Sequence, residues 1–208
     1  MQPSIDEPMT LRPLEGFVVG VTADRRWEEQ AELLARRGAS VMHGPTITTL
    51  YLASDENLRQ ATVALIAEPP DYLVATTGIG MRAWLDTAST WGIGDELLAA
   101  LRGARIVARG PKASAAVQIG GLEVWQRSPT ERMGALVELL TAEPLAGKRV
   151  AVQEYGMKSP EVTDALVAAG AIVVSVPVYR WQVPDDPSAA RRLVQAACQG
   201  QVDAITFT

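Results

Sequence analysis

The chain nearly repeats itself, at an offset of about 131–132 residues. Four landmarks keep this register: residues 14–21 and 145–152, 38–41 and 170–173, Pro45 and Pro177, and 71–76 and 203–208. A shared register of this kind indicates two similar α/β units, and a ligand-binding cleft commonly forms where two such units face each other. The second copy stops on a strand, about half a unit short. We therefore expect the natural polypeptide to continue beyond Thr208, with a Ser/Thr-capped helix.

Short apolar runs alternate with segments of helical period along the chain, a pattern typical of βαβ units and a largely parallel sheet. Strands are expected at residues 17–21, 41–43, 72–75, 106–108, 150–152, 172–176 and 204–207. Ser54 is expected to cap a helix over 55–67, and Thr130 to cap another that buries Met133 and Leu136. Two extended segments, 46–53 and 183–187, interrupt the alternation, and we interpret them as linkers. We expect the stretches near 46–53 and 178–184 to cross side by side, strands 17–21 and 204–207 to share one sheet, and strands 72–75, 106–108 and 150–152 to share another.

Composition excludes several classes of function. No apolar run approaches the ~20 residues that a membrane-spanning helix needs, and a net charge of −5 argues against general affinity for nucleic acid or anionic membranes. Cys198 and His43 are the one cysteine and the one histidine, so a Cys/His zinc site is not expected. This cysteine usage favours a reducing cytoplasm. Residues 1–13, rich in prolines and acids, are predicted to be a disordered tail.

The order of elements, the repeat and the segment VPVYRW at 176–181 resemble uroporphyrinogen-III synthase, the enzyme family that closes linear hydroxymethylbilane into a ring while inverting its last pyrrole. The resemblance covers about residues 14–208. It implies an α/β fold of two similar doubly wound parallel-sheet domains, joined by two crossing extended linkers, with the second repeat truncated. Residues 14–48 and 182–208 would form an incomplete first domain and 52–178 the second. No cofactor is implied.

Three further segments resemble an actinobacterial branch of that family: 21–26 (VTADRR), 75–80 (ATTGIG) and 108–113 (ARGPKA). In that branch the synthase-like region is followed by a winged-helix DNA-binding domain, and the proteins are described as transcriptional regulators, some linked to nitrate and nitrite assimilation. The resemblance therefore implies a ligand-sensing domain. DNA would be bound only by a C-terminal domain that is absent from these 208 residues.

The family's substrate is a polycarboxylate, so the implied ligand is an anionic small molecule such as a tetrapyrrole, held between the domains. Helix N-termini that follow strands attract anions, and Thr76 and Thr77 stand at such a junction, although simple helix capping explains them as well. Tyr179 corresponds to the tyrosine most often implicated in catalysis, where it would donate to the departing hydroxyl. The alternative is a linker residue with a buried ring and a solvated hydroxyl. The candidate ligand-binding residues are Thr76, Thr77, Arg109, Lys112, Ser114, Lys158, Arg180, Arg25 and Thr208.

Departures from the family pattern fall on expected ligand loops. Lys112 stands where the family often has threonine, and the loop 153–158 replaces a glycine- and arginine-rich one. These changes indicate a retained scaffold with an altered site. Three functions therefore remain: a sensory domain, an active cyclising lyase, and a generic nucleotide-binding module.

The segment Gly78–Gly80 lacks the third glycine of a dinucleotide fingerprint, and Ser-His-Asp catalysis would need His43, expected on a strand.

Overall fold

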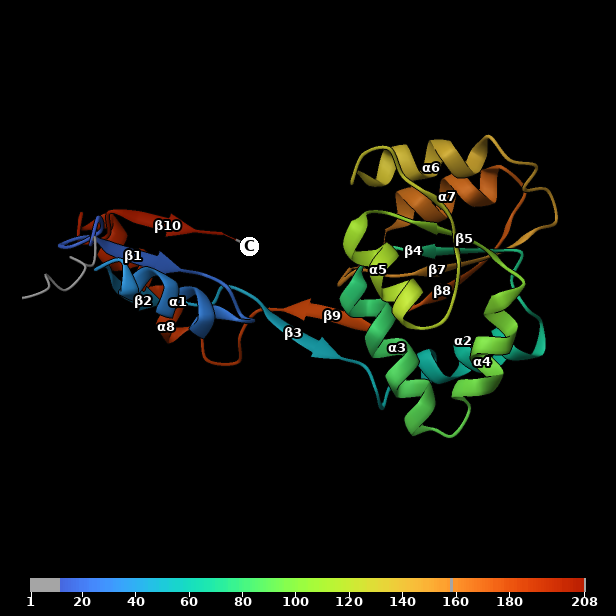
Figure 1. Ribbon diagram of the computed structural model, residues 1–208, viewed down its shortest axis with the longest axis horizontal. Coiled ribbons are helices and arrows are strands. Elements are labelled where there is room, and N and C mark those ends of the chain that lie inside the picture. The colour runs from blue at the N-terminus through green and yellow to red at the C-terminus, as the bar shows by residue number, and fades with distance from the viewer. Residues whose placement is uncertain (1–11, 158, 208) are drawn as a thin grey trace, which may run out of the picture. The chain divides into compact units, whose positions relative to one another are not determined.

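The computed structural model describes residues 12–157 and 159–207. The chain divides into two compact units, each with its own parallel sheet (Figure 1). The smaller unit takes in the chain up to Thr49 and again from Trp181, and the larger unit is Leu50–Arg180. The predicted α/β fold class is confirmed. The tail predicted over residues 1–13 falls almost wholly outside the described residues, as do Lys158 and Thr208.

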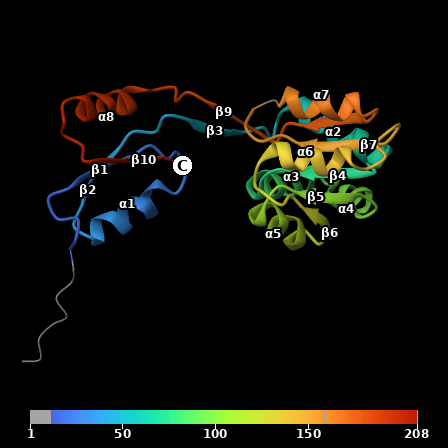
Figure 2. The same ribbon diagram turned by 90° about the horizontal axis from the view of Figure 1, so that it is seen from above.

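The smaller unit has a three-stranded parallel sheet of order β10-β1-β2. Its elements are β1 (Val18–Val21), α1 (Trp27–Arg36), β2 (Ser40–His43), α8 (Ser188–Cys198) and β10 (Ala204–Thr206). The helices α1 and α8 lie on opposite faces of this sheet (Figure 2). The buried Leu193 of α8 packs closely on the sheet, since a Cβ at Gly20 or at Gly44 would lie 2.7 Å from its side chain. His43, predicted to be structural, stacks on Trp27 at 3.9 Å between ring centroids.

The larger unit has a five-stranded parallel sheet of order β6-β5-β4-β7-β8, called here the larger sheet. Its strands are β4 (Tyr72–Ala75), β5 (Arg105–Ala108), β6 (Val124–Arg127), β7 (Arg149–Gln153) and β8 (Ile172–Val176). Its helices are α2 (Glu56–Ala67), α3 (Gly78–Thr90), α4 (Gly94–Arg102), α5 (Pro111–Ile119), α6 (Met133–Thr141) and α7 (Pro160–Ala168). Every residue of the central strand β4 is buried, as expected for a parallel strand covered on both faces.

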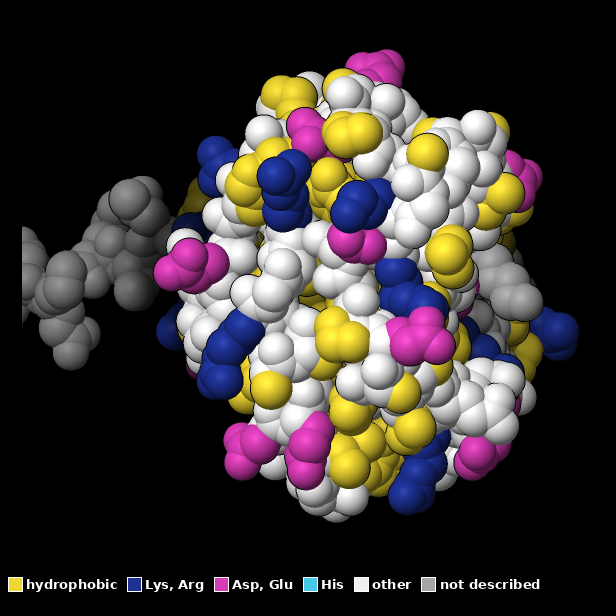
Figure 3. All heavy atoms as spheres, turned by 90° about the vertical axis from the view of Figure 1, so that its right-hand side faces the viewer, with side chains coloured by type: hydrophobic (Ala, Val, Ile, Leu, Met, Phe, Trp, Pro, Cys, Tyr) yellow, Lys and Arg dark blue, Asp and Glu magenta, His cyan; other side chains and the backbone are white. Residues whose placement is uncertain are grey.

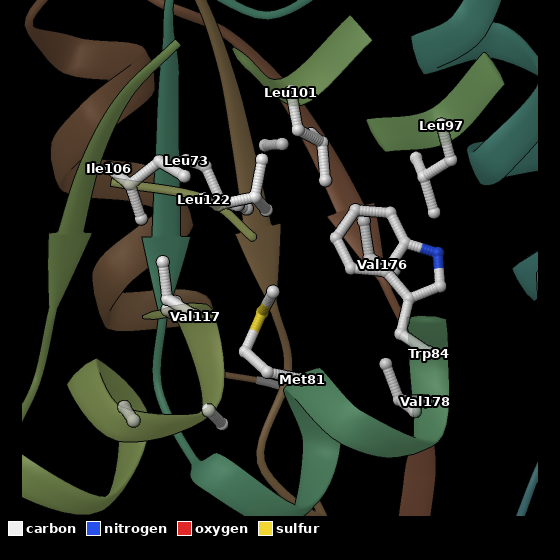
Figure 4. Packing of buried hydrophobic residues seen from close by; sticks show 14 of the residues in the cluster. Leu73, Met81, Trp84, Leu97, Leu101, Ile106, Val117, Leu122, Val176 and Val178 are labelled. Carbon is white, nitrogen blue, oxygen red and sulfur yellow. The ribbon is translucent and has the colours of Figure 1, made fainter. Parts of the chain in front are cut away.

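Alternate residues of β4 enter two different cores. Leu73 and Ala75 pack with α2, α3, α4 and α5 on one face, and Tyr72 and Val74 pack with α6 and α7 on the other. This alternation follows from the two-residue period of a strand. Figure 4 shows the indole of Trp84 near Leu97, and its Nε1 donates to Thr62 Oγ1 at 2.9 Å, which satisfies the buried N–H.

The strands β3 (Thr48–Tyr51) and β9 (Tyr179–Gln182) pair as a separate two-stranded sheet. Leu52 N continues the pairing by donating to Val178 O at 2.9 Å. The sequence predicted that extended segments near 46–53 and 178–184 run side by side, and this pairing is confirmed. Likewise confirmed is the prediction that β1 and β10 share one sheet while β4, β5 and β7 share another.

Two predicted helix caps are wrong. The N-cap of α2 is Asp55, whose Oδ1 accepts from Asn57 N at 2.8 Å, and not Ser54. The N-cap of α6 is Arg132, and the Thr130 side chain accepts from Arg132 N at 3.4 Å, before the helix begins. Adjacent Ser, Thr and Asp side chains compete for the same N–H groups, so the sequence alone left the choice undecided. The helix α4 was not expected at all.

Candidate functional site

The candidate site lies at the carboxyl edge of the larger sheet, where ligands bind in open parallel sheets. Thr76 and Thr77 follow β4, Arg109 follows β5, and Gln153 ends β7. Tyr179, the first residue of β9, reaches the same edge, with its hydroxyl 3.3 Å from Thr77 Oγ1. The structure thus brings together side chains from four separate chain segments.

Thr76 is buried, with only 2% of its surface exposed, and its polar groups are bound within the protein. Its Oγ1 donates to the Gln153 backbone O at 2.7 Å and lies 3.0 Å from Gln153 Oε1. Its N–H donates to the same Oε1 at 3.2 Å. Thr76 therefore holds the end of β4 against β7, and a direct contact between Thr76 and a ligand stays a prediction.

Thr77 is the N-cap of α3. Its backbone is extended (φ −140°, ψ 142°), and its Oγ1 accepts from Gly80 N at 3.1 Å. The capping interpretation of Thr77 is thus observed. The same Oγ1 also faces Tyr179, so capping and a role at the site are compatible. Thr77 N, in turn, donates to Gln153 Oε1 at 3.0 Å.

Tyr179 is 4% exposed and belongs to the core that α2, α3, α4 and α5 cover. Its ring is tilted by 54° against the ring of Tyr51, with centroids 6.5 Å apart. The buried ring agrees with both interpretations of Tyr179, and its hydroxyl lies 3.3 Å from Thr77 Oγ1. A catalytic role for Tyr179 stays a prediction.

Two glycines bring the first turn of α3 close to its neighbours. A Cβ at Gly78 would lie 2.2 Å from Lys112 O, at the start of α5. A Cβ at Gly80 would lie 2.2 Å from Gln153 Nε2 and 2.8 Å from Thr77 Oγ1. Close packing thus accounts for both glycines of the Gly-Ile-Gly segment. It lets two helix N-termini and the Gln153 amide approach each other.

The candidate cations differ in their surroundings. Arg109 is half-buried, and its backbone N–H donates to Ala75 O at 2.9 Å. Its guanidinium carbon lies 5.1 Å from the centroid of the Tyr155 ring. Lys112 is exposed on the first turn of α5. Arg180 is exposed on β9, and its backbone forms an isolated bridge with Gly156. The site thus has one cation held on an aromatic ring and two extended toward solvent.

The remaining candidate ligand-binding residues are Ser114, Arg25, Lys158 and Thr208. Ser114 lies in α5, and its Oγ is buried with no hydrogen-bond partner among the described residues. Arg25 is exposed on the loop after β1, in the smaller unit. Lys158 and Thr208 lie outside the described residues. A ligand contact by any of these four residues stays a prediction.

Gln153 is the residue of the site that sequence reasoning missed. It was included only as the first residue of an altered loop, yet its fully buried amide contacts both Thr76 and Thr77. The available signal was a polar residue at the end of an otherwise apolar strand. Polar groups in that position need partners, and β7 pairs directly with β4.

The opposite edge of the larger sheet holds a cavity of about 210 Å³ between the amino ends of β5 and β6. Arg105, which lines it, stacks on Tyr72 and Trp125 and pairs with Glu143 at 3.0 Å. In the view of Figure 3, acidic and basic side chains are interspersed. The cavity is separate from the candidate site, because it lies at the opposite edge of the larger sheet.

Among the described residues, no helix combines the length and the apolar character needed to cross a membrane. Nor does any group of three or more His, Cys, Asp or Glu side chains in residues 12–157 and 159–207 form a place for a metal ion. The site's chemistry is that of hydroxyls, an amide, a phenol and guanidinium groups.

Comparison with known proteins gives concordant results. The family model described as "HEM4: Uroporphyrinogen-III synthase HemD" matches residues 28–208. A Bacillus subtilis (strain 168) protein named "Uncharacterized protein YjjA" is 29% identical over 195 residues, which are 94% of this chain and 72% of that protein. Solved structures of uroporphyrinogen III synthase from the extremely thermophilic bacterium Thermus thermophilus are 28% identical. They match 91% of this chain and 71% of theirs, with TM-scores of 0.78 for a mutant and 0.67 for the wild type.

Proposed function

Because this chain belongs to the uroporphyrinogen-III synthase family, we propose that the carboxyl edge of its larger sheet binds an anionic polycarboxylate, a tetrapyrrole or its linear precursor. We propose further that this binding serves ligand sensing in a transcriptional regulator, in which DNA would be contacted only by a domain outside these 208 residues. The observation that carries the proposal is the meeting of Tyr179 and Thr77 at the N-terminus of α3.

Electrostatics favour an anion at this place. The N-termini of α3 and α5 approach each other there, as the close contact between Gly78 and Lys112 O requires. Each N-terminus carries a positive dipole end. Arg109 adds a guanidinium that can pair with a carboxylate in bidentate fashion. In a chain of net charge −5, these local groups supply the attraction that the overall charge opposes.

The arrangement of Gln153 supports sensing over turnover. Its Oε1 already accepts from the N–H groups of Thr76 and Thr77, which are the donors that a ligand carboxylate would otherwise use there. A ligand at this place must either bind beside the amide or exchange with it. Exchange of an internal acceptor for a ligand couples binding to a local rearrangement, and a sensor needs such coupling.

A second candidate function, the active synthase, is favoured by the Tyr179 hydroxyl. A phenol is protonated at neutral pH, which is the form that donates to a leaving hydroxyl. Thr77 places this phenol at the end of the sheet where a ligand is expected.

One set of measurements separates the two functions. Calorimetric titration with uroporphyrinogen-like polycarboxylates measures binding, and conversion of hydroxymethylbilane to the type III ring measures turnover. Binding without turnover supports the sensor. Turnover that Tyr179→Phe abolishes, while affinity stays nearly intact, supports the enzyme. Absence of both binding and turnover would refute the proposed ligand class.

A further inference from the structure

We infer that Gln153 fixes the direction of the hydrogen bond between Thr77 and Tyr179, so that the Thr77 hydroxyl donates and the Tyr179 oxygen accepts. Gln153 is then a positioning residue that acts on Tyr179 through Thr77. The inference rests on the proposed function only in placing Tyr179 at a ligand site. The direction of the hydrogen bond belongs to the fold and can be tested without a ligand.

The orientation of the Gln153 amide follows from its neighbours. The N–H groups of Thr76 and Thr77 lie 3.2 Å and 3.0 Å from Gln153 Oε1. Backbone N–H groups can only donate, so the atom that faces them must be the amide oxygen. A flipped amide would set N–H against N–H in a fully buried position. The nitrogen Nε2 is thereby directed to the other side, where it donates to Glu154 O and to Thr77 Oγ1 at 3.4 Å.

The Thr77 hydroxyl then has one remaining option. A threonine hydroxyl accepts two hydrogen bonds and donates one. Gly80 N, at 3.1 Å, and Gln153 Nε2, at 3.4 Å, are both obligate donors, and together they occupy both acceptor positions. The third neighbour among the described residues is the Tyr179 hydroxyl at 3.3 Å, which can donate or accept. Thr77 therefore directs its proton to Tyr179.

The shape of α3 supports this arrangement. A side chain at position 80 would collide with Gln153 Nε2 at 2.2 Å and crowd Thr77 Oγ1 at 2.8 Å. The glycine thus leaves space for the amide at the point where the amide meets Thr77. An alanine there would be the better helix former, so the glycine is explained by the amide and not by helix stability.

The consequence for Tyr179 is a directed proton. A phenol oxygen that accepts from Thr77 has its own O–H turned away from Thr77. A donor to that oxygen also stabilises the ionised phenol, and so lowers the pKa of Tyr179 relative to a site in which Thr77 accepts. At a ligand site, this prepares Tyr179 to donate to an oxygen atom other than that of Thr77.

The test is a near-ultraviolet absorbance titration of Tyr179, with the Tyr179→Phe protein subtracted as baseline. Gln153→Glu keeps an acceptor for Thr76 and Thr77 but removes the Nε2 donor, so Thr77 is released to accept from Tyr179. We expect the pKa of Tyr179 to rise, partly through the new charge. In a protein that also carries Thr77→Val, Gln153→Glu still adds its negative charge near Tyr179, but no Thr77 hydroxyl is left to change its hydrogen bond.

The proton-dissociation constant of Tyr179 should therefore fall about two- to tenfold more in the Thr77 background than in the valine background, as expected for one hydrogen bond. Equal falls in the two backgrounds, or no fall in either, would overturn the inference. Gln118→Glu, on an exposed position of α5, is the control for added charge and should leave Tyr179 unaffected.

A neutral variant covers the case in which Thr77→Val does not fold, as judged by circular dichroism. Gln153→Met has a similar shape, carries no charge and also removes the Nε2 donor. It should raise the pKa of Tyr179 as well, and an unchanged pKa would overturn the inference. A failure of the protein to bind any polycarboxylate would refute the proposed function but would not alter these titrations, so the two failures are distinguishable.

Discussion

Replacing Gly80 by alanine should destabilise the larger unit. At a helix position with free space, the same replacement should instead stabilise the protein. The new methyl group would lie 2.2 Å from Gln153 Nε2, so the amide must move. When it moves, Gln153 Oε1 leaves the backbone donors Thr76 N and Thr77 N, which lie 3.2 Å and 3.0 Å from it. Two backbone donors thereby lose their acceptor, whereas Thr76 Oγ1 keeps its hydrogen bond to the Gln153 backbone O.

The magnitude follows from typical contributions of hydrogen bonds. Loss of two hydrogen bonds costs about 1–3 kcal/mol, and alanine in place of glycine in a helix returns about 0.5–1 kcal/mol. The expected net loss in the free energy of unfolding is about 0.5–2 kcal/mol. The matched control is Gly134→Ala in the first turn of α6, where a Cβ meets no atom within 4 Å. It should raise stability by up to about 1 kcal/mol.

Urea denaturation of both variants, followed by tryptophan fluorescence, measures this difference. Trp84 is fully buried in the core that includes α3, and it reports on the affected region. If Gly80→Ala were as stable as Gly134→Ala, the Gln153 amide could not be held as the structure shows. The directed hydrogen bond between Thr77 and Tyr179 would then lose its basis as well.

Three further predictions concern binding and stability. Arg109→Ala should lower affinity for a polycarboxylate about tenfold or more, the effect of one charged hydrogen bond, whereas Arg102→Ala at the opposite edge of the sheet should leave calorimetric affinity unchanged. Asp71→Asn should make the free energy of unfolding less sensitive to acid. The hydrogen bonds from Lys148 Nζ, at 2.8 Å, and then from the next backbone N–H lower the pKa of Asp71. The stabilisation by Asp71 is therefore present above the ordinary aspartate pKa range and is lost as pH falls through the lowered pKa, which urea denaturation at several pH values measures. Trp84→Ala should cost about 3–5 kcal/mol of unfolding free energy in urea, because a large buried side chain leaves a cavity.

The positions of the strands along the chain could be predicted from the sequence because their signals are local and periodic. The alternation of apolar runs placed the strands along the chain, and the family resemblance implied their division between two sheets and the two crossing segments that became β3 and β9. The helix caps could not be predicted as well. Neighbouring side chains such as Ser54 and Asp55 are chemically equivalent caps, and small differences in backbone direction decide which one reaches the N–H group.

The sequence also determined the chemical types at the site, since hydroxyls and cations follow the ends of apolar strands. Only the tertiary structure decided which of them meet. Thr77 and Tyr179 are 102 positions apart, and their contact depends on how β9 packs against the start of α3. Gln153 reaches Thr76 and Thr77 only because β7 is the direct neighbour of β4. Strand order is set by long-range packing, and therefore no local pattern in the sequence could reveal the role of this amide.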